Sequence, residues 1–212
     1  MITLKYFVFN SFQVNTYLLT DETGTGIIID PSFETETEYA QLKAYLKEKK
    51  IKLTAVVNTH GHVDHLLGVS RMVKDLKIPF KMHRNEELLL SSARITAEMF
   101  GLAFDETPVI NQYIDESDRI EIGKHTLQVM HIPGHSPGGL AFYSAADKFV
   151  IVGDILFRSS IGRTDLPGGD YDSLISGIKQ KLLTLPPETN VYSGHGPSTT
   201  IGAEHDTNPF LI

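Results

Sequence analysis

Three imidazoles and one carboxylate stand within six residues of this chain, in the run His60-x-His62-x-Asp64-His65. The run directly follows residues 53–58, a short apolar stretch that predicts a strand. A fold gains no core packing from such a run, and a purely structural role would require every one of these polar groups to be hydrogen-bonded. Imidazole and carboxylate together suit Zn, Fe or Mn. A turn that projects the first two imidazoles to one side and Asp64 and His65 to the other would offer ligands to two metal ions.

Four further polar residues share one setting, the end of a predicted strand beside a Gly or Pro. They are His135, Asp154, His195 and Asp30. Glycine at such places lets the backbone bend so that a side chain turns into a cleft. One His or Asp beside a Gly is usually only a turn, but the repeated setting predicts that these side chains converge. Asp30 is expected to orient a ligand His or to cap the turn at Pro31.

The amino-acid composition limits the kinds of reaction and partner that the protein can have. The chain has no Cys, which excludes disulfides, thiolate metal ligands and a cysteine nucleophile and fits a reducing compartment. Nineteen Lys and Arg against 26 Asp and Glu give a net charge of −7, so no nucleic-acid partner is expected. Apolar runs stay far below the roughly 20 residues that span a bilayer, and the N-terminus does not resemble a signal peptide. We expect a cytoplasmic protein with a small-molecule substrate, no membrane partner and an undetermined oligomeric state.

The 212 residues predict one domain over residues 1–212, built from two β-rich halves that each carry helices. Sheets packed face to face with helices outside follow from this order. The predicted strands are residues 2–9, 14–20, 27–29, 53–58, 78–82, 120–122, 127–131, 140–143, 149–152 and 191–193. The predicted helices are residues 35–50, 66–76, 86–100 and 171–185.

Residues outside the polar set have simpler interpretations. Arg163 either binds an anionic part of a substrate or pairs with Asp165 or Asp170. It is a candidate substrate-binding residue. His131 is expected to be a hydrogen-bonded structural residue. The surface is the expected place for His83, His125 and His205.

The ordered set of polar residues resembles the metallo-β-lactamase superfamily over essentially the whole chain. The resemblance implies an α/β fold, a four-layer αββα sandwich with the metal site at one edge of the two sheets. It also implies a role for each polar residue: His60, His62 and His135 on a first metal ion, Asp64, His65 and His195 on a second, and Asp154 bridging both.

Within that superfamily, residues 153–157 and 162–169 are similar to the glyoxalase II-like hydrolases, whose type member is a hydroxyacylglutathione hydrolase. The C-terminal helical domain of glyoxalase II proper has no counterpart after His195. The resemblance implies hydrolysis of an ester or thioester with two divalent ions, Zn in preference to Fe or Mn. A water between two cations is acidified enough to supply hydroxide at neutral pH, and Asp64 and Asp154 are the expected catalytic residues that orient it.

Two other functions remain open. The segment from Gly162 to Asp165 also resembles the persulfide dioxygenases of the superfamily, in which His60, His135 and Asp154 would hold a single iron. Two His and one carboxylate are the ligands expected for non-haem iron that activates oxygen. A metal-holding interaction module without turnover is the third interpretation.

Overall fold

The computed structural model describes residues 1–212 and contains two six-stranded sheets and a small two-stranded hairpin. The first sheet, in the order β1-β2-β3-β4-β5-β6, consists of β1 (Thr3–Phe9), β2 (Val14–Thr20), β3 (Thr25–Ile29), β4 (Lys52–Val57), β5 (Phe80–Met82) and β6 (Gln112–Tyr113). The second sheet has the order β14-β13-β10-β9-β8-β7. Its strands are β7 (Arg119–Ile122), β8 (His125–His131), β9 (Leu140–Ser144), β10 (Phe149–Gly153), β13 (Asn190–Ser193) and β14 (Thr199–Thr200). The hairpin joins β11 (Leu156–Phe157) to β12 (Ser160–Ile161).

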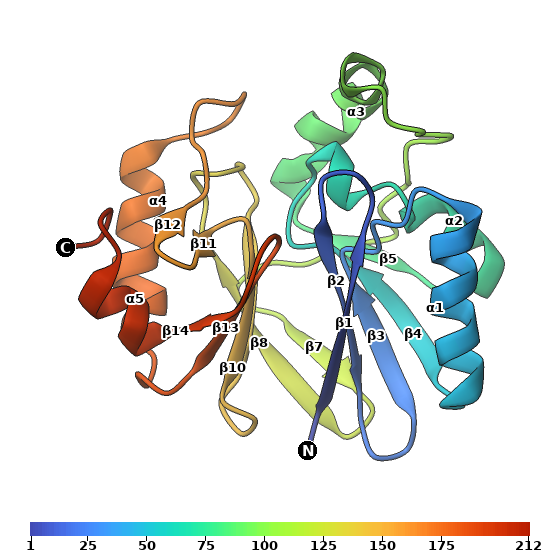
Figure 1. Cartoon of the computed structure of the whole chain (residues 1–212), viewed down its shortest axis with the longest axis horizontal. Helices are drawn as coiled ribbons and strands as arrows, with labels where there is room; N and C mark the ends of the chain where they lie inside the picture. Colours follow the sequence, from blue (N-terminus) through green and yellow to red (C-terminus); the bar gives the residue numbers. More distant parts are fainter.

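Helices cover the outer face of each sheet. Figure 1 shows the two sheets in the middle of the molecule, with one group of helices on either side. The first group comprises α1 (Glu36–Glu48), α2 (Val69–Leu76) and α3 (Glu87–Phe100). The second comprises α4 (Tyr171–Gly177), a π-helical turn at Ile178–Leu182 and α5 (Ile201–Thr207). None of these helices is long and apolar enough to cross a bilayer.

Three buried clusters separate the four layers. One lies between α1–α3 and the first sheet, one between the two sheets, and one between the second sheet and α4 and α5. The alternation of strand side chains explains the division, because successive residues point to opposite faces. In β2, Leu18 packs toward the helices, whereas Tyr17 and Leu19 pack between the sheets. The expected αββα sandwich is therefore confirmed.

The chain direction brings the polar residues to one edge. Strands β3 and β4 run parallel, as do β10 and β13, so their carboxyl ends meet at the same side of the molecule. The start of β2 also reaches this edge, where Asn15 N–H donates to the Gly194 carbonyl at 2.7 Å and Val14 forms a bridge with His195. This contact ties the two sheets together at the predicted metal site.

Several elements differ from the sequence prediction. The patterns did not reveal β6, β11, β12, β14 or α5, and the helix expected over residues 66–76 begins only at Val69, after a short 3₁₀ turn at Val63–His65. The helix expected over residues 171–185 changes to a π-helical turn at Ile178. These differences concern short elements, whose few residues give little periodic signal.

Candidate metal centre

All seven polar residues that the resemblance implied as ligands lie together at the shared edge of the sheets. The run from His60 to His65 follows β4, and the other three residues come from the second half of the chain, after β8, β10 and β13. His135 lies in the loop between β8 and β9, Asp154 follows β10, and His195 follows β13. The site therefore depends on both sheets.

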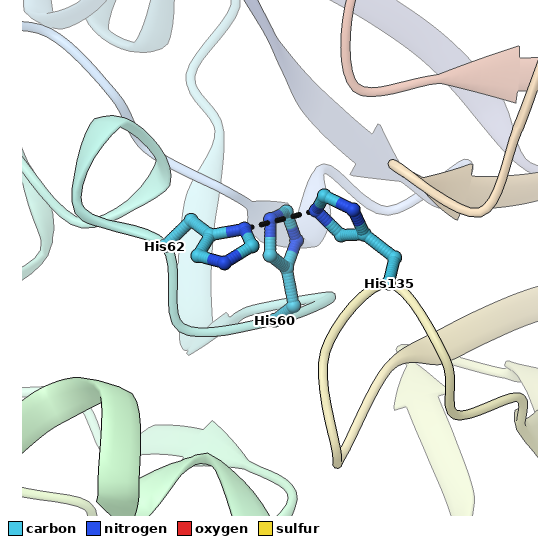
Figure 2. Close-up of side chains that lie close together, drawn as sticks. All are labelled: His60, His62 and His135. Carbon is cyan, nitrogen blue, oxygen red and sulfur yellow. Dashed lines mark hydrogen bonds between the residues drawn. The ribbon is translucent and has the colours of Figure 1, made fainter. Parts of the chain in front are cut away.

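The first group contains His60, His62 and His135. Figure 2 shows the three rings directed toward one another, two from the loop after β4 and one from the facing loop. One nitrogen from each ring lies within 4.8 Å of the others, and His62 Nδ1 is 2.9 Å from His135 Nε2. His60 and His135 are buried and His62 is nearly so. The spacing is that of three ligands around one ion.

The second group contains Asp64, His65 and His195. His65 Nε2 and His195 Nε2 are 3.3 Å apart, and His195 Nε2 is 3.3 Å from Asp64 Oδ2. One donor atom from each of these residues lies within 4.8 Å of the others. His65 is fully buried, whereas the other two residues remain partly accessible from solvent.

Asp154 lies between the two groups. Its Oδ1 is 3.5 Å from His65 Nε2, and its Oδ2 is 3.5 Å from His195 Nε2 and 3.7 Å from His135 Nε2. One carboxylate thus faces donor atoms of both groups, the position that a bridging ligand requires.

Hydrogen bonds on the side away from the site fix the orientation of the histidine rings. Four of the five Nδ1 atoms have a fixed protein partner on the side away from the site: Thr59 Oγ1 for His60 (3.0 Å), Asp30 Oδ2 for His65 (3.0 Å), the Arg163 carbonyl for His135 (2.8 Å) and the Phe12 carbonyl for His195 (2.9 Å). Such partners fix the tautomer and leave Nε2 available to a metal ion. Asp30 contacts a histidine of the site, as expected from the sequence. Thr59 and Phe12 had no sequence signal for this role.

The two groups differ in protonation. Burial lowers the pKa of His60 well below its ordinary value and that of His62 to about 4, and burial also lowers the pKa of His135. Burial acts in the same direction on His65 and His195, but carboxylates outweigh it. Asp64 and Asp154 raise the pKa of His65 to about 9, and hydrogen bonds that His195 donates to Asp154 and Asp64 raise its pKa to about 10. At neutral pH the first group is neutral, and the second pairs two imidazolium ions with two carboxylates.

The donor set fits divalent metal ions. His60 Nε2 and Asp154 Oδ1 are buried without any hydrogen-bond partner. Buried polar atoms without partners are costly, and a cation near Asp154 would satisfy such atoms together. Imidazole nitrogens with carboxylate oxygens are a donor set for Zn, Fe or Mn.

Glycine is required where the groups approach one another. A Cβ atom at Gly194 would overlap Asp154 Oδ1 and lie 2.8 Å from His65 Cε1. Any larger residue would push apart the carboxylate and a ring that face the same space.

Sequence reasoning missed one buried carboxylate next to the site. Glu86, in the 3₁₀ turn Arg84–Glu86 before α3, is completely buried and accepts hydrogen bonds from the N–H of Gly61 at 2.7 Å and of Gly138 at 2.5 Å. Gly61 lies between the candidate ligands His60 and His62, and Gly138 belongs to the loop of His135. Glu86 thus joins both loops of the first group. Burial raises its pKa.

Two histidines near Glu86 bear on other expectations. His83 was expected at the surface, but it is buried and stacks on His131 with ring centroids 4.2 Å apart. The expectation was wrong because the sequence does not show that β5 and β8 end beside each other. His131 is a structural residue as expected, with Nε2 3.1 Å from the Pro137 carbonyl.

Arg163 lies at the rim of a cavity of about 510 Å³ that opens onto the metal centre. Its guanidinium makes two hydrogen bonds to Asp165, at 2.8 and 2.7 Å, and both side chains are exposed. Of the partners considered from the sequence, Asp165 is the one that Arg163 contacts.

Comparison with known proteins identifies the family. A model of the metallo-beta-lactamase superfamily matches residues 10–195. The chain belongs to the metallo-beta-lactamase superfamily. The matched segment contains all seven residues of the candidate centre and the strands from β2 to β13.

Relatives in this superfamily match the chain over nearly its full length. The probable metallo-hydrolase YqgX of Bacillus subtilis is 37% identical over 200 residues, which cover 94% of this chain and 92% of the relative. Hydroxyacylglutathione hydrolase GloC of Haemophilus influenzae is 34% identical over 203 residues, covering 95% and 94%. The crystal structure of TTHA1623 in a di-iron-bound form is 40% identical, with a TM-score of 0.88 and coverage of 98% of this chain and 100% of that one. These similarities support a metallo-hydrolase.

Proposed function

We propose that this protein hydrolyses esters or thioesters with two divalent metal ions bound at the centre described above. The observation that carries the proposal is the position of Asp154, whose two oxygens face His65 on one side and His135 and His195 on the other. A site for one ion would need neither this carboxylate between the groups nor the second group of Asp64, His65 and His195.

His60, His62 and His135 would hold one ion, Asp64, His65 and His195 the other, and Asp154 both. When bound, such ions lower the pKa of a water molecule and polarise a carbonyl oxygen. Asp64 and Asp154 would accept a hydrogen bond from that water and set its orientation toward the substrate. The backing of Thr59, Asp30, Arg163 and Phe12 keeps the rings fixed during the reaction.

The relatives support this proposal in different respects. GloC is named for hydrolysis of a hydroxyacylglutathione, which is a thioester. TTHA1623 was crystallised with two irons, which supports two metal positions. We propose Zn for the present chain, with Fe and Mn as alternatives, because the donor set suits all three.

The test combines metal content with turnover. Protein purified without chelator is analysed by plasma mass spectrometry and assayed with S-D-lactoylglutathione and S-acetyl-N-acetylcysteamine. We expect two ions per chain and thioester hydrolysis that is lost with EDTA and restored by Zn. His195→Ala removes a ligand of the second group alone and is expected to leave about one ion per chain with most of the activity lost.

Different results would favour the other two interpretations. One iron per chain, with oxygen uptake that depends on a persulfide, would support the dioxygenase. In that case His195→Ala would keep its metal. A metal-loaded protein that hydrolyses no thioester, lactone, phosphodiester or β-lactam would be a metal-holding module.

A further inference from the structure

The cavity that opens onto the metal centre has walls of a different character from its floor. Its volume of about 510 Å³ lies within the range of about 300–1,000 Å³ for small-molecule sites. The floor consists of candidate ligands such as His62, Asp154 and His195. The walls come from the hairpin between β1 and β2, from α3, and from residues 163–167. Apart from the main-chain carbonyls of Phe12 and Arg163, which hold two histidine rings, the walls have no part in the chemistry proposed above.

Exposed apolar side chains form much of these walls. Leu88 and Phe100 on α3 are 59% and 56% exposed, and Phe12 at the hairpin tip is 40% exposed. Phe12 and Phe100 make an edge-to-face contact with centroids 5.7 Å apart, which joins the hairpin to α3 above the cavity. Leu166 and Pro167 line the cavity as well. Apolar surface that converges on a cavity is suited to an apolar ligand group.

The hydroxyl groups in the walls are already used by the protein. Ser91 Oγ donates to the Leu88 carbonyl at 2.7 Å, and Ser92 Oγ to the Leu89 carbonyl at 3.1 Å. Thr96 Oγ1 donates to the Ser92 carbonyl at 3.0 Å. Hydroxyl groups that donate to their own helix carbonyls can still accept a hydrogen bond but offer no free donor to an anionic ligand group.

The cavity walls also carry little net charge. Arg163 is the only Arg or Lys that lines the cavity, and its charge is paired with Asp165 through two hydrogen bonds. Apart from the ions proposed for the floor, a substrate with several carboxylates would therefore meet one cation in the walls, and that cation is already paired.

We propose that the substrate carries an uncharged apolar group on one side of the scissile bond, seated between Phe12, Leu88 and Phe100. The proposal rests on the hydrolase function above and specifies its substrate class as neutral alkyl or aryl thioesters or esters. Burial of each additional CH₂ group in these walls is expected to raise kcat/KM about fourfold until the cavity is full.

Two homologous series test this on the metal-loaded protein. One varies the acyl group of N-acetylcysteamine thioesters from acetyl to octanoyl, and the other varies the alkyl thiol of acetyl thioesters from ethyl to octyl. We expect kcat/KM to rise with length in at least one series and to exceed the value for S-D-lactoylglutathione. Leu88→Ala and Phe100→Ala are expected to reduce the gain per CH₂ by at least half. Met99→Ala is the matched control on α3, because Met99 is 79% exposed and does not line the cavity.

The outcomes separate this proposal from the hydrolase function. Hydrolysis with no length dependence in either series would overturn the apolar group and leave the hydrolase intact. A preference for S-D-lactoylglutathione that Arg163→Ala abolishes would also overturn it and make Arg163 the anion clamp. If no thioester is hydrolysed, calorimetry with neutral alkyl methyl ketones decides. Affinity that rises with chain length supports an apolar site, and affinity that does not rise rejects it.

Discussion

Asp154 is the single residue whose carboxylate faces donor atoms of both groups of the candidate metal centre. The carboxylate is 13% exposed, and the raised pKa values of two of its imidazole neighbours, His65 and His195, make both rings imidazolium ions at neutral pH in the metal-free chain. Their charge lowers the pKa of Asp154 even though burial opposes that shift. The negative charge of Asp154 therefore serves both states, as a partner of imidazolium ions without metal and as a proposed bridge between cations with metal.

Asp154→Asn is expected to weaken both metal ions, because a neutral amide cannot offset the repulsion between two cations. The loss of activity is expected to exceed about 100-fold, the upper end for residues that only orient a ligand. Equilibrium dialysis and steady-state kinetics measure the two effects. Two ions per chain with unaltered turnover would contradict the bridging role.

The raised pKa values of His65 and His195 predict that metal binding releases protons. With pKa values of about 9 and about 10, both rings are protonated at pH 7.5 and must lose their protons to bind an ion. We expect about two protons released for the second group and none for the first. Calorimetry in buffers of different ionisation enthalpy counts them, and His195→Ala should reduce the count by about one. A heat independent of the buffer would contradict this prediction.

The same shifts determine how the metal-free fold responds to pH. A pKa raised by folding stabilises the protein fully below the unfolded value of about 6.5. This contribution is then lost as the pH rises through about 9 for His65 and about 10 for His195. The affinity of the second group for metal changes in the opposite sense and increases with pH over that window.

At the scale of elements, the 3₁₀ turn before α3 connects two loops that the sequence places far apart. Glu86→Ala leaves the N–H groups of Gly61 and Gly138 unpaired, and each such buried group costs about 1–3 kcal/mol. We expect the affinity of the first group for metal to fall about 10–100-fold, as for other residues that hold ligands in place. Glu86→Gln, which keeps one acceptor oxygen, is expected to lie between.

Competition with a chromophoric chelator measures this affinity. Glu98→Ala is the matched control, because Glu98 is an exposed carboxylate on α3, the helix that follows the turn of Glu86. Equal affinities for Glu86→Ala and the unaltered protein would show that the contacts of Glu86 do not position the loops.

The strand ends that hold the ligands were predictable because apolar runs followed by Gly are a local signal. The run from His60 to His65 after β4 is the clearest example, because its local sequence alone predicts a cluster of polar side chains. Glu86 could not be found in this way, because its partners are 25 and 52 residues distant. Helix α5 was missed because it has seven residues and includes Gly202, which disfavours helix.

At the scale of the whole molecule, the proposed ions join the two halves of the sandwich. The run after β4 belongs to the first sheet, and His135, Asp154 and His195 belong to the second. An ion that binds only when both sheets are in place stabilises the fold by mass action, by about 2.7 kcal/mol at 100 times its dissociation constant.

For a chain of this size, we expect metal to raise Tm by about 5–10 °C for each ion under that condition. Scanning calorimetry with Zn and with EDTA measures the difference. His195→Ala should show about half of the increase. A Tm that stays the same after complete metal removal would mean that the sheets do not depend on the ions.

Phe12, at the tip of the hairpin between β1 and β2, has one role for its main chain and another for its side chain. Its carbonyl holds the His195 ring through a main-chain bond, whereas its aromatic ring forms part of the cavity wall. Every amino acid has the carbonyl, so exchange of the side chain alters the wall and leaves the support of the metal ligand in place. Substitutions at position 12, in evolution or in engineering, can therefore change the substrate preference without altering the metal centre.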